Sequence, residues 1–171
     1  MTNDVEEVSI VNNNLNSKIA KKVAERGLPK LIDLYSKYDV QSTFYFTGTF
    51  ANNFPESIQS VIDHDHEVGC HGYSHLHRHS FDVMPVKEQY NHLLKAKSKI
   101  EEVAGRIEAF RAPALRIGFQ TPLVLEKLGF KTDSSVAPRR FDGPLTSGAL
   151  KKLNWLFSPR APYRMNPNNP F

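Results

Sequence analysis

The sequence predicts an α/β fold in which short, mostly parallel strands alternate with helices. Three observations support this class. Apolar residues recur at helical spacing in several long segments, short segments rich in apolar and aromatic residues lie between them, and prolines and glycines separate the two kinds of segment. Strands that alternate with helices of about ten or more residues are typical of βα units on a parallel sheet.

Each predicted helix shows an apolar stripe, a start or stop signal, or both. Pro55, Pro85 and Pro122 stand at helix starts, where the missing N–H is tolerated. Gly105 and Gly129 stand where helices should end. Four helices are predicted on this basis, over residues 18–38, 55–64, 85–103 and 121–128.

The predicted strands are short and fall between these helices. They cover residues 41–47, 67–70, 107–110, 130–133 and 155–157. Within the first helix, Pro29 should cause a kink or mark a second start near Leu28. Loops are expected directly after Gly48 and over residues 71–84.

Composition narrows the class of protein. A chain of 171 residues suggests one domain or a large piece of one. No run approaches the roughly 18 apolar residues of a membrane helix, so no membrane span is expected. The single cysteine, Cys70, excludes an internal disulfide and fits a reducing compartment or a chain without need of disulfides. Since the residues after Met1 do not resemble a signal peptide, the default prediction is cytoplasmic.

Charge is distributed unevenly along the chain. Residues 1–75 carry 6 basic and 10 acidic side chains, whereas residues 76–171 carry 16 basic and 8 acidic ones. A basic half can bind nucleic acid. Here the basic residues are scattered and no basic block contains aromatics, so a solvated surface is favoured and no nucleic-acid partner is expected.

Histidines are concentrated just after the predicted strand 67–70. Four of the seven lie within nine residues, at His71, His75, His77 and His79. The spacing of His71 and His75 would place both imidazoles on one side of a helical turn, within reach of one metal ion. The alternative is a polar surface loop, but the density favours a metal site with His71 and His75 as ligands.

Carboxylates near the N-terminus are candidates to complete such a site. Asp4 and Glu6 alternate, so on an extended segment they point to the same side. One could bind a metal while the other acts as a base. Taken alone, acidic residues near a terminus are more often simply solvated.

Two further polar groups follow predicted strands. Arg111 comes directly after the strand 107–110, and an arginine there can hold a carboxylate in a fixed orientation. Asp133 ends the strand 130–133, where a turn or helix cap is the simpler interpretation. All these groups lie at carboxyl ends of strands, where barrel-like α/β folds carry their active sites.

These residues resemble the polysaccharide deacetylase family of metal-dependent carbohydrate esterases. The segment from His71 to His75 resembles the family motif His-(Ser/Thr)-x-x-His, and the lead-in from His66 to Gly69 is also similar. The arginine motif resembles Arg111-Ala112-Pro113. The similarity extends over residues 40–48 and 129–135, and covers nearly all of residues 1–140.

The resemblance implies an incomplete, distorted (β/α) barrel. A closed barrel takes about 200–250 residues, so the chain is expected to be a fragment cut at both ends. The deacetylase-like catalytic domain is expected over residues 1–158. Residues 159–171, rich in proline and asparagine, are expected to form a loop or loose tail.

The resemblance also implies a role for each candidate residue. Glu6, His71 and His75 would bind a divalent metal ion, zinc first, with cobalt or another ion as alternatives. Asp4 would be the base, Arg111 would orient it and Asp133 would support that network. A backbone N–H near Tyr73 or Leu115 would face the oxyanion. The implied substrate is an N-acetylated sugar or polysaccharide, and the oligomeric state stays open.

The sequence departs from the family pattern at three positions. The first motif is usually Thr-Phe-Asp-Asp-Gly, whereas Val5 follows Asp4 here, as in branches that place the second acid two residues later. Gly72 replaces the usual Ser or Thr. No histidine follows His92, although the family supplies its general acid from a late histidine. A non-catalytic carbohydrate-binding or structural relative, and an esterase for O-acetyl sugars, therefore stay as alternatives.

Overall fold

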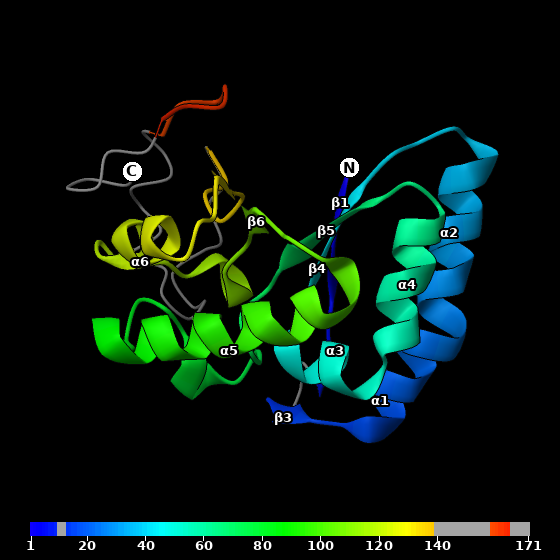
Figure 1. Ribbon diagram of the computed structural model, residues 1–171, viewed down its shortest axis with the longest axis horizontal. Coiled ribbons are helices and arrows are strands. Elements are labelled where there is room, and N and C mark those ends of the chain that lie inside the picture. Colours follow the sequence, from blue (N-terminus) through cyan, green and yellow to red (C-terminus); the bar gives the residue numbers. More distant parts are fainter. Residues whose placement is uncertain (10–12, 139–157, 165–171) are drawn as a thin grey trace.

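The protein contains one five-stranded sheet in which all neighbouring strands run parallel (Figure 1). The structure is a computed structural model that describes residues 1–9, 13–138 and 158–164. In sheet order, the strands are β1 (Thr2–Val5), β4 (Thr43–Phe46), β5 (Glu67–Cys70), β6 (Ala109–Phe110) and β7 (Thr132–Asp133). Within the described residues the sheet is open, with β1 and β7 at its edges. The predicted α/β class with parallel strands is confirmed.

Helices connect the successive strands of this sheet (Figure 1). They are α1 (Ser17–Lys22), α2 (Leu28–Lys37), α3 (Gly48–Asn53), α4 (Pro55–Asp63), α5 (Val86–Ala104) and α6 (Thr121–Lys127). Contacts run from α2 to α4, from α4 to α5 and from α5 to α6, so the helices form a row that follows the strand order. None of the helices in the described ranges is long and apolar enough to cross a membrane.

The first predicted helix is interrupted at the place where Pro29 indicated a change. A π-helical turn over Val23–Gly27 separates α1 from α2. Pro29 lies in the first turn of α2, directly after this π-helical turn. The second start near Leu28 is therefore confirmed, and the other three predicted helices closely match α4, α5 and α6.

Several short elements differ from the prediction. Helix α3 occupies the expected loop after Gly48, because the Thr47 hydroxyl caps it by accepting the Phe50 N–H at 3.3 Å. A hairpin of β2 (Val8–Ser9) and β3 (Asn14–Leu15) was not predicted, since two-residue strands show no periodicity. Strands β6 and β7 are shorter than expected. The predicted strand 155–157 lies outside the described residues.

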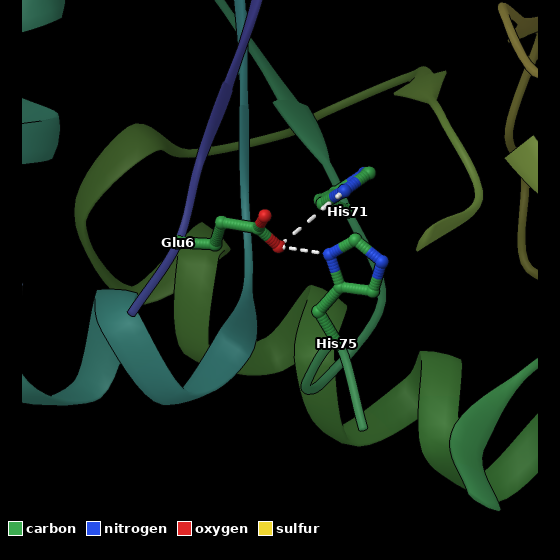
Figure 2. Close-up of side chains that lie close together, drawn as sticks. All are labelled: Glu6, His71 and His75. Atoms are coloured by element: carbon green, nitrogen blue, oxygen red, sulfur yellow. Dashed lines mark hydrogen bonds and ion pairs between the residues drawn. The ribbon is translucent and has the colours of Figure 1, made fainter. Parts of the chain in front are cut away.

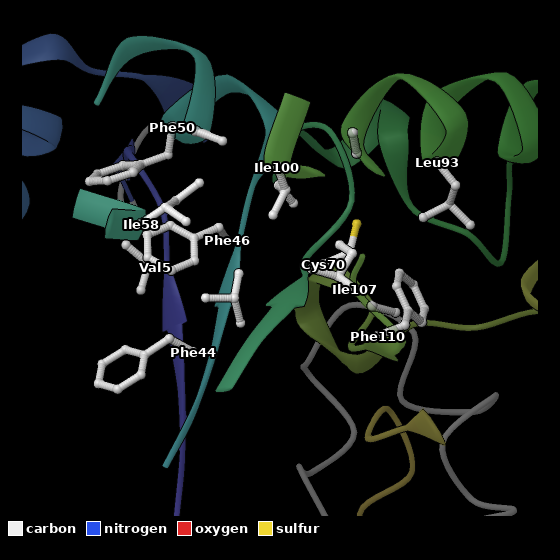
Figure 3. Packing of buried hydrophobic residues seen from close by; sticks show 14 of the residues in the cluster. Val5, Phe44, Phe46, Phe50, Ile58, Cys70, Leu93, Ile100, Ile107 and Phe110 are labelled. Carbon is white, nitrogen blue, oxygen red and sulfur yellow. The ribbon is translucent and has the colours of Figure 1, made fainter. Parts of the chain in front are cut away.

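Residue alternation in β4 divides the sheet into two different faces. Phe44 and Phe46 point into the apolar core beneath the helices and are fully buried there (Figure 3). Tyr45, between them, faces the other way and lies over β5. A Cβ at Gly69 would stand 2.6 Å from the Tyr45 ring, so the absence of a side chain there makes room for the tyrosine. The core anchors β4 while its opposite face stays available to polar groups.

Candidate metal centre and active site

The three predicted metal ligands meet at the carboxyl ends of the strands (Figure 2). Glu6 directly follows β1, and His71 directly follows β5. One ligand atom from each of Glu6, His71 and His75 lies within 4.8 Å of the others. Glu6 Oε2 contacts His75 Nδ1 and stands 3.8 Å from His71 Nε2. His77 and His79 do not belong to this group.

The two histidines do not share a helical turn, as their spacing had suggested. The residues between them form a loop, and Gly72 there has φ +73°, which favours glycine. The loop begins where the His71 N–H donates to Phe46 O at 2.7 Å. The imidazoles therefore approach each other through this loop and not along a helix face.

His71 is held in the protonation state that a metal ligand needs. Its Nδ1 lies 2.8 Å from the Arg111 carbonyl oxygen, which can only accept a hydrogen bond, so Nδ1 carries the proton. Burial lowers the pKa of His71, although the Asp4 and Glu6 carboxylates oppose that shift, so the ring is neutral at neutral pH. Its Nε2 is buried, has no hydrogen-bond partner in the part of the chain that the structure describes, and faces the carboxylates. An orphaned imidazole nitrogen beside carboxylate oxygens suits a divalent cation such as zinc.

Asp4 lies beside this group, but its contacts differ from those of Glu6. Asp4 Oδ1 accepts from Arg111 Nη1 at 2.9 Å, while Oδ2 stands 3.8 Å from His71 Nε2. Glu6 approaches both histidines, whereas Asp4 contacts only His71 of the two and forms its other ion pair with Arg111. The two acids of the N-terminal segment thus reach the same place, as their alternation predicted, with different partners.

Arg111 is anchored on several sides. Its guanidinium donates to the Thr2 hydroxyl and to the Ser134 hydroxyl, each at 2.7 Å, in addition to Asp4. The plane lies over the Tyr45 ring, with Cζ 4.6 Å from the ring centroid. A guanidinium with this many fixed partners holds the Asp4 carboxylate in one orientation.

Asp133 is connected to the backbone next to Arg111 through Ser135. Its Oδ1 accepts from the backbone N–H of Ser135 at 2.9 Å and from the Ser135 hydroxyl. The same hydroxyl accepts the Ala112 N–H at 2.8 Å. Asp133 therefore braces the backbone next to Arg111 and makes no direct hydrogen bond to Asp4 or to the guanidinium. Burial raises the pKa of Asp133 to about 6, although the Ser135 bonds and Arg111 oppose the shift.

The raised pKa of Asp133 predicts a measurable pH dependence of stability. Because its pKa is about 6 in the folded chain against 3.8 in the unfolded one, the folded state binds the proton more tightly between these values. The contribution of Asp133 to the unfolding free energy therefore falls as the pH rises through that window. The Asp133→Asn variant has no carboxyl group to ionise at this position. The difference in unfolding free energy, variant minus unmodified chain, should therefore rise by roughly 2 kcal/mol from pH 4 to pH 7. Urea unfolding at both pH values measures this, and a constant difference between the two chains contradicts it.

The two backbone groups expected near an oxyanion are already occupied. The Tyr73 N–H donates to His92 Nε2 at 2.7 Å, and the Leu115 N–H donates to Ala112 O at 2.9 Å. Both N–H groups are therefore engaged within the protein in this structure, and the expectation that an N–H near Tyr73 or Leu115 faces the oxyanion stays a prediction.

Sequence reasoning missed two residues that support the site. The Asn13 carboxamide donates to His75 O at 3.2 Å and accepts from the His77 N–H at 2.8 Å, which ties the β2–β3 hairpin to the histidine loop. The buried Glu7 accepts from the Thr47 hydroxyl at 3.1 Å, and burial raises its pKa. Both contacts join segments about 40 or more residues apart, and no local pattern predicts them.

Fold and site together define an α/β protein whose parallel strands present a group of histidines and carboxylates suited to a divalent metal ion. A family model described as polysaccharide deacetylase matches residues 20–132, and the chain belongs to that family. The matched region contains His71, His75 and Arg111, while Asp4 and Glu6 lie before it.

Curated relatives cover most of this chain but extend well beyond it. The chain is 33% identical over 118 residues to a peptidoglycan deacetylase of Helicobacter pylori, which is 68% of this chain and 39% of that protein. It is 26% identical over 129 residues to a chitooligosaccharide deacetylase of Azorhizobium caulinodans, which is 73% of this chain and 60% of that protein. The chain thus spans less than two thirds of the length of either relative.

Solved structures agree with the fold. A putative polysaccharide deacetylase from Mycobacterium smegmatis has a TM-score of 0.67 and 27% identity, over 80% of this chain and 50% of that one. A protein of Bacillus anthracis described as a CE4 family pseudoenzyme has a TM-score of 0.61 and 19% identity, over 78% of this chain and 42% of that one. At that identity the second likeness shows the fold alone.

Proposed function

We propose that this chain is part of a metal-dependent hydrolase that removes the acetyl group from an N-acetylated sugar or sugar polymer. One observation carries the proposal: the Glu6, His71 and His75 group stands beside the Asp4–Arg111 pair at the carboxyl ends of the strands. A metal site next to an independently held carboxylate is what amide hydrolysis by activated water requires. The names of the relatives, which include peptidoglycan and chitooligosaccharide deacetylases, support the choice of substrate class.

Glu6, His71 and His75 would hold the cation, with zinc as the first choice and cobalt as an alternative. When bound, such an ion polarises the acetyl carbonyl and lowers the pKa of a coordinated water. The ligands are suited to this task because His71 keeps Nε2 unprotonated and Glu6 reaches both imidazoles. A site with three protein ligands would leave a position for water and substrate.

Asp4 is the proposed base. Arg111 binds Oδ1, which leaves the lone pairs of Oδ2 available beside His71 Nε2, where the reacting water would stand. Oδ2 would accept the water proton as the new C–O bond forms, and would return it to the nitrogen as the C–N bond breaks. The products are acetate and a free amine. Asp4 would thereby also protonate the departing amine, the role for which the expected late histidine was not found in this sequence.

Acetate release tests the proposal. The chain, freed of metal with a chelator and then given zinc or cobalt, is incubated with N-acetylated chitooligosaccharides, with peptidoglycan and with an O-acetylated sugar. We expect metal-dependent acetate release from an N-acetylated substrate. Release only from the O-acetylated sugar would instead indicate an esterase. Metal binding without any release would indicate the non-catalytic relative.

A further inference from the structure

His92 of α5 lies directly against the loop that carries the two histidine ligands. Its Nε2 accepts the Tyr73 N–H at 2.7 Å. The ring packs edge-on against Phe81, with centroids 5.6 Å apart, and its centroid is 4.8 Å from that of His79. Nε2 of His92 is therefore engaged as an acceptor on the backbone of this loop.

The imidazole of His92 is kept in the form that this contact needs. A backbone N–H can only donate, so Nε2 is unprotonated and Nδ1 carries the proton. Burial lowers the pKa of His92 to about 3, and the positive charges of His79 and Lys95 act in the same direction. The acceptor is therefore present throughout the neutral pH range.

The peptide group joined by this contact is held at both ends. Its carbonyl, on Gly72, accepts the Gly48 N–H at 2.9 Å, while its N–H, on Tyr73, donates to His92. A peptide group is planar, with N–H and C=O pointing in opposite directions. Rotation of this unit would therefore break both hydrogen bonds, one to the start of α3 and one to α5.

Space for this arrangement depends on the residue at position 72. A Cβ on Gly72 would lie 3.2 Å from His92 Nε2 and 3.4 Å from both Phe81 and Pro113. A larger residue would press on the histidine that supports the loop. Gly72, which departs from the family motif, thus leaves the space beside its backbone that His92 occupies. His92 is the histidine that lies too early in the chain to be the family's proton donor.

We propose that His92 is a positioning residue that fixes the Gly72–Tyr73 peptide group and thereby the mutual placement of His71 and His75 for metal binding. The inference rests on the proposed metal site and adds a determinant of its affinity. The peptide group lies between the two ligands in the chain, so loss of its orientation would let the imidazoles move apart. Partners that orient metal ligands typically change metal affinity by about 10–100-fold.

The test compares His92→Leu, which removes the acceptor, with His92→Gln, whose side-chain oxygen can still accept the Tyr73 N–H. Binding of Co²⁺ is followed by its visible absorption spectrum, with the metal-free melting temperature measured in parallel. We expect His92→Leu to bind Co²⁺ about 10–100-fold more weakly with an altered spectrum, and His92→Gln to recover most of the affinity. His64→Leu, a change of an exposed histidine at the end of α4, is the matched control and should bind normally.

The outcomes separate this inference from the metal site itself. Failure of the unmodified chain to bind Co²⁺ overturns the proposed site and the inference with it. Normal binding by the unmodified chain and by His92→Leu overturns the role of His92 alone, as does a His92→Gln variant as weak as His92→Leu. Nitrogen NMR of the unmodified chain gives a readout without any variant: an unprotonated Nε2 on His92 at pH 6–8 supports the role, and a protonated one overturns it.

Discussion

Replacing His71 with alanine should abolish tight metal binding. His71 contributes a buried Nε2 that has no hydrogen-bond partner among the described residues, and His75 cannot take its place, because its Nδ1 already contacts Glu6. A three-ligand site reduced to two ligands loses one of its donor atoms and with it the coordination geometry. We expect the variant to retain less than a tenth of an equivalent of zinc or cobalt after dialysis, and to release no acetate.

A matched histidine separates this effect from a general loss of structure. His77 is exposed and lies outside the ligand group, although it belongs to the same segment of chain. His77→Ala should keep a full equivalent of metal. His71→Ala also removes the hydrogen bond to Arg111 O, worth about 1 kcal/mol, so circular dichroism of both metal-free variants checks the fold. One equivalent of metal in a folded His71→Ala variant would show that His71 is not a ligand.

Asp4→Asn should leave the metal bound and remove turnover. Asparagine keeps an oxygen that can accept from Arg111 Nη1, so the side chain can stay in place. Its amide nitrogen replaces Oδ2, the proposed proton acceptor near His71. We expect kcat for acetate release to fall by roughly 10²–10⁴-fold, with Co²⁺ affinity close to that of the unmodified chain.

The combination of readouts distinguishes a base from a ligand. Full activity in Asp4→Asn would assign the base to another group. Loss of metal together with activity would instead make Asp4 a ligand, which its 3.8 Å separation from His71 Nε2 makes a real alternative. Asp33→Asn, a change of an exposed carboxylate on α2, is the control and should alter neither quantity.

Sequence reasoning was effective where chemistry is concentrated within a few residues. The histidine spacing and the alternation of Asp4 with Glu6 are local patterns, and both pairs meet in the structure. Likewise, the proline and glycine signals located α4, α5 and α6 closely. The proline and glycine signals and the Asp4–Glu6 alternation depend on backbone geometry that is set within one or two turns of chain, whereas His71 and His75 meet through a loop.

Contacts between distant segments were not predictable in this way. Asn13 reaches the His75 loop from 62 residues away, and His92 reaches Tyr73 from 19. The role of Asp133 depends on a serine hydroxyl that bridges it to Ala112, a link set by the pairing of β6 with β7. Each of these side chains looks like an ordinary polar residue in the sequence, because its partner is specified only by the tertiary fold.

The edge position of β1 connects the chemistry of the site to local stability. Within the described sheet, β1 has one neighbour, β4, yet it delivers Asp4 and leads directly into Glu6. Strand β1 forms backbone hydrogen bonds on one side only within the described sheet. The side-chain contacts from Glu6 to the histidines, and from Asp4 to Arg111, therefore add to its stability. Any ion that binds Glu6 and His71 together also favours the docked strand, by the mass-action term that couples ligand concentration to folding. Cation concentration would thus control fraying of the N-terminal strand as well as occupancy of the centre.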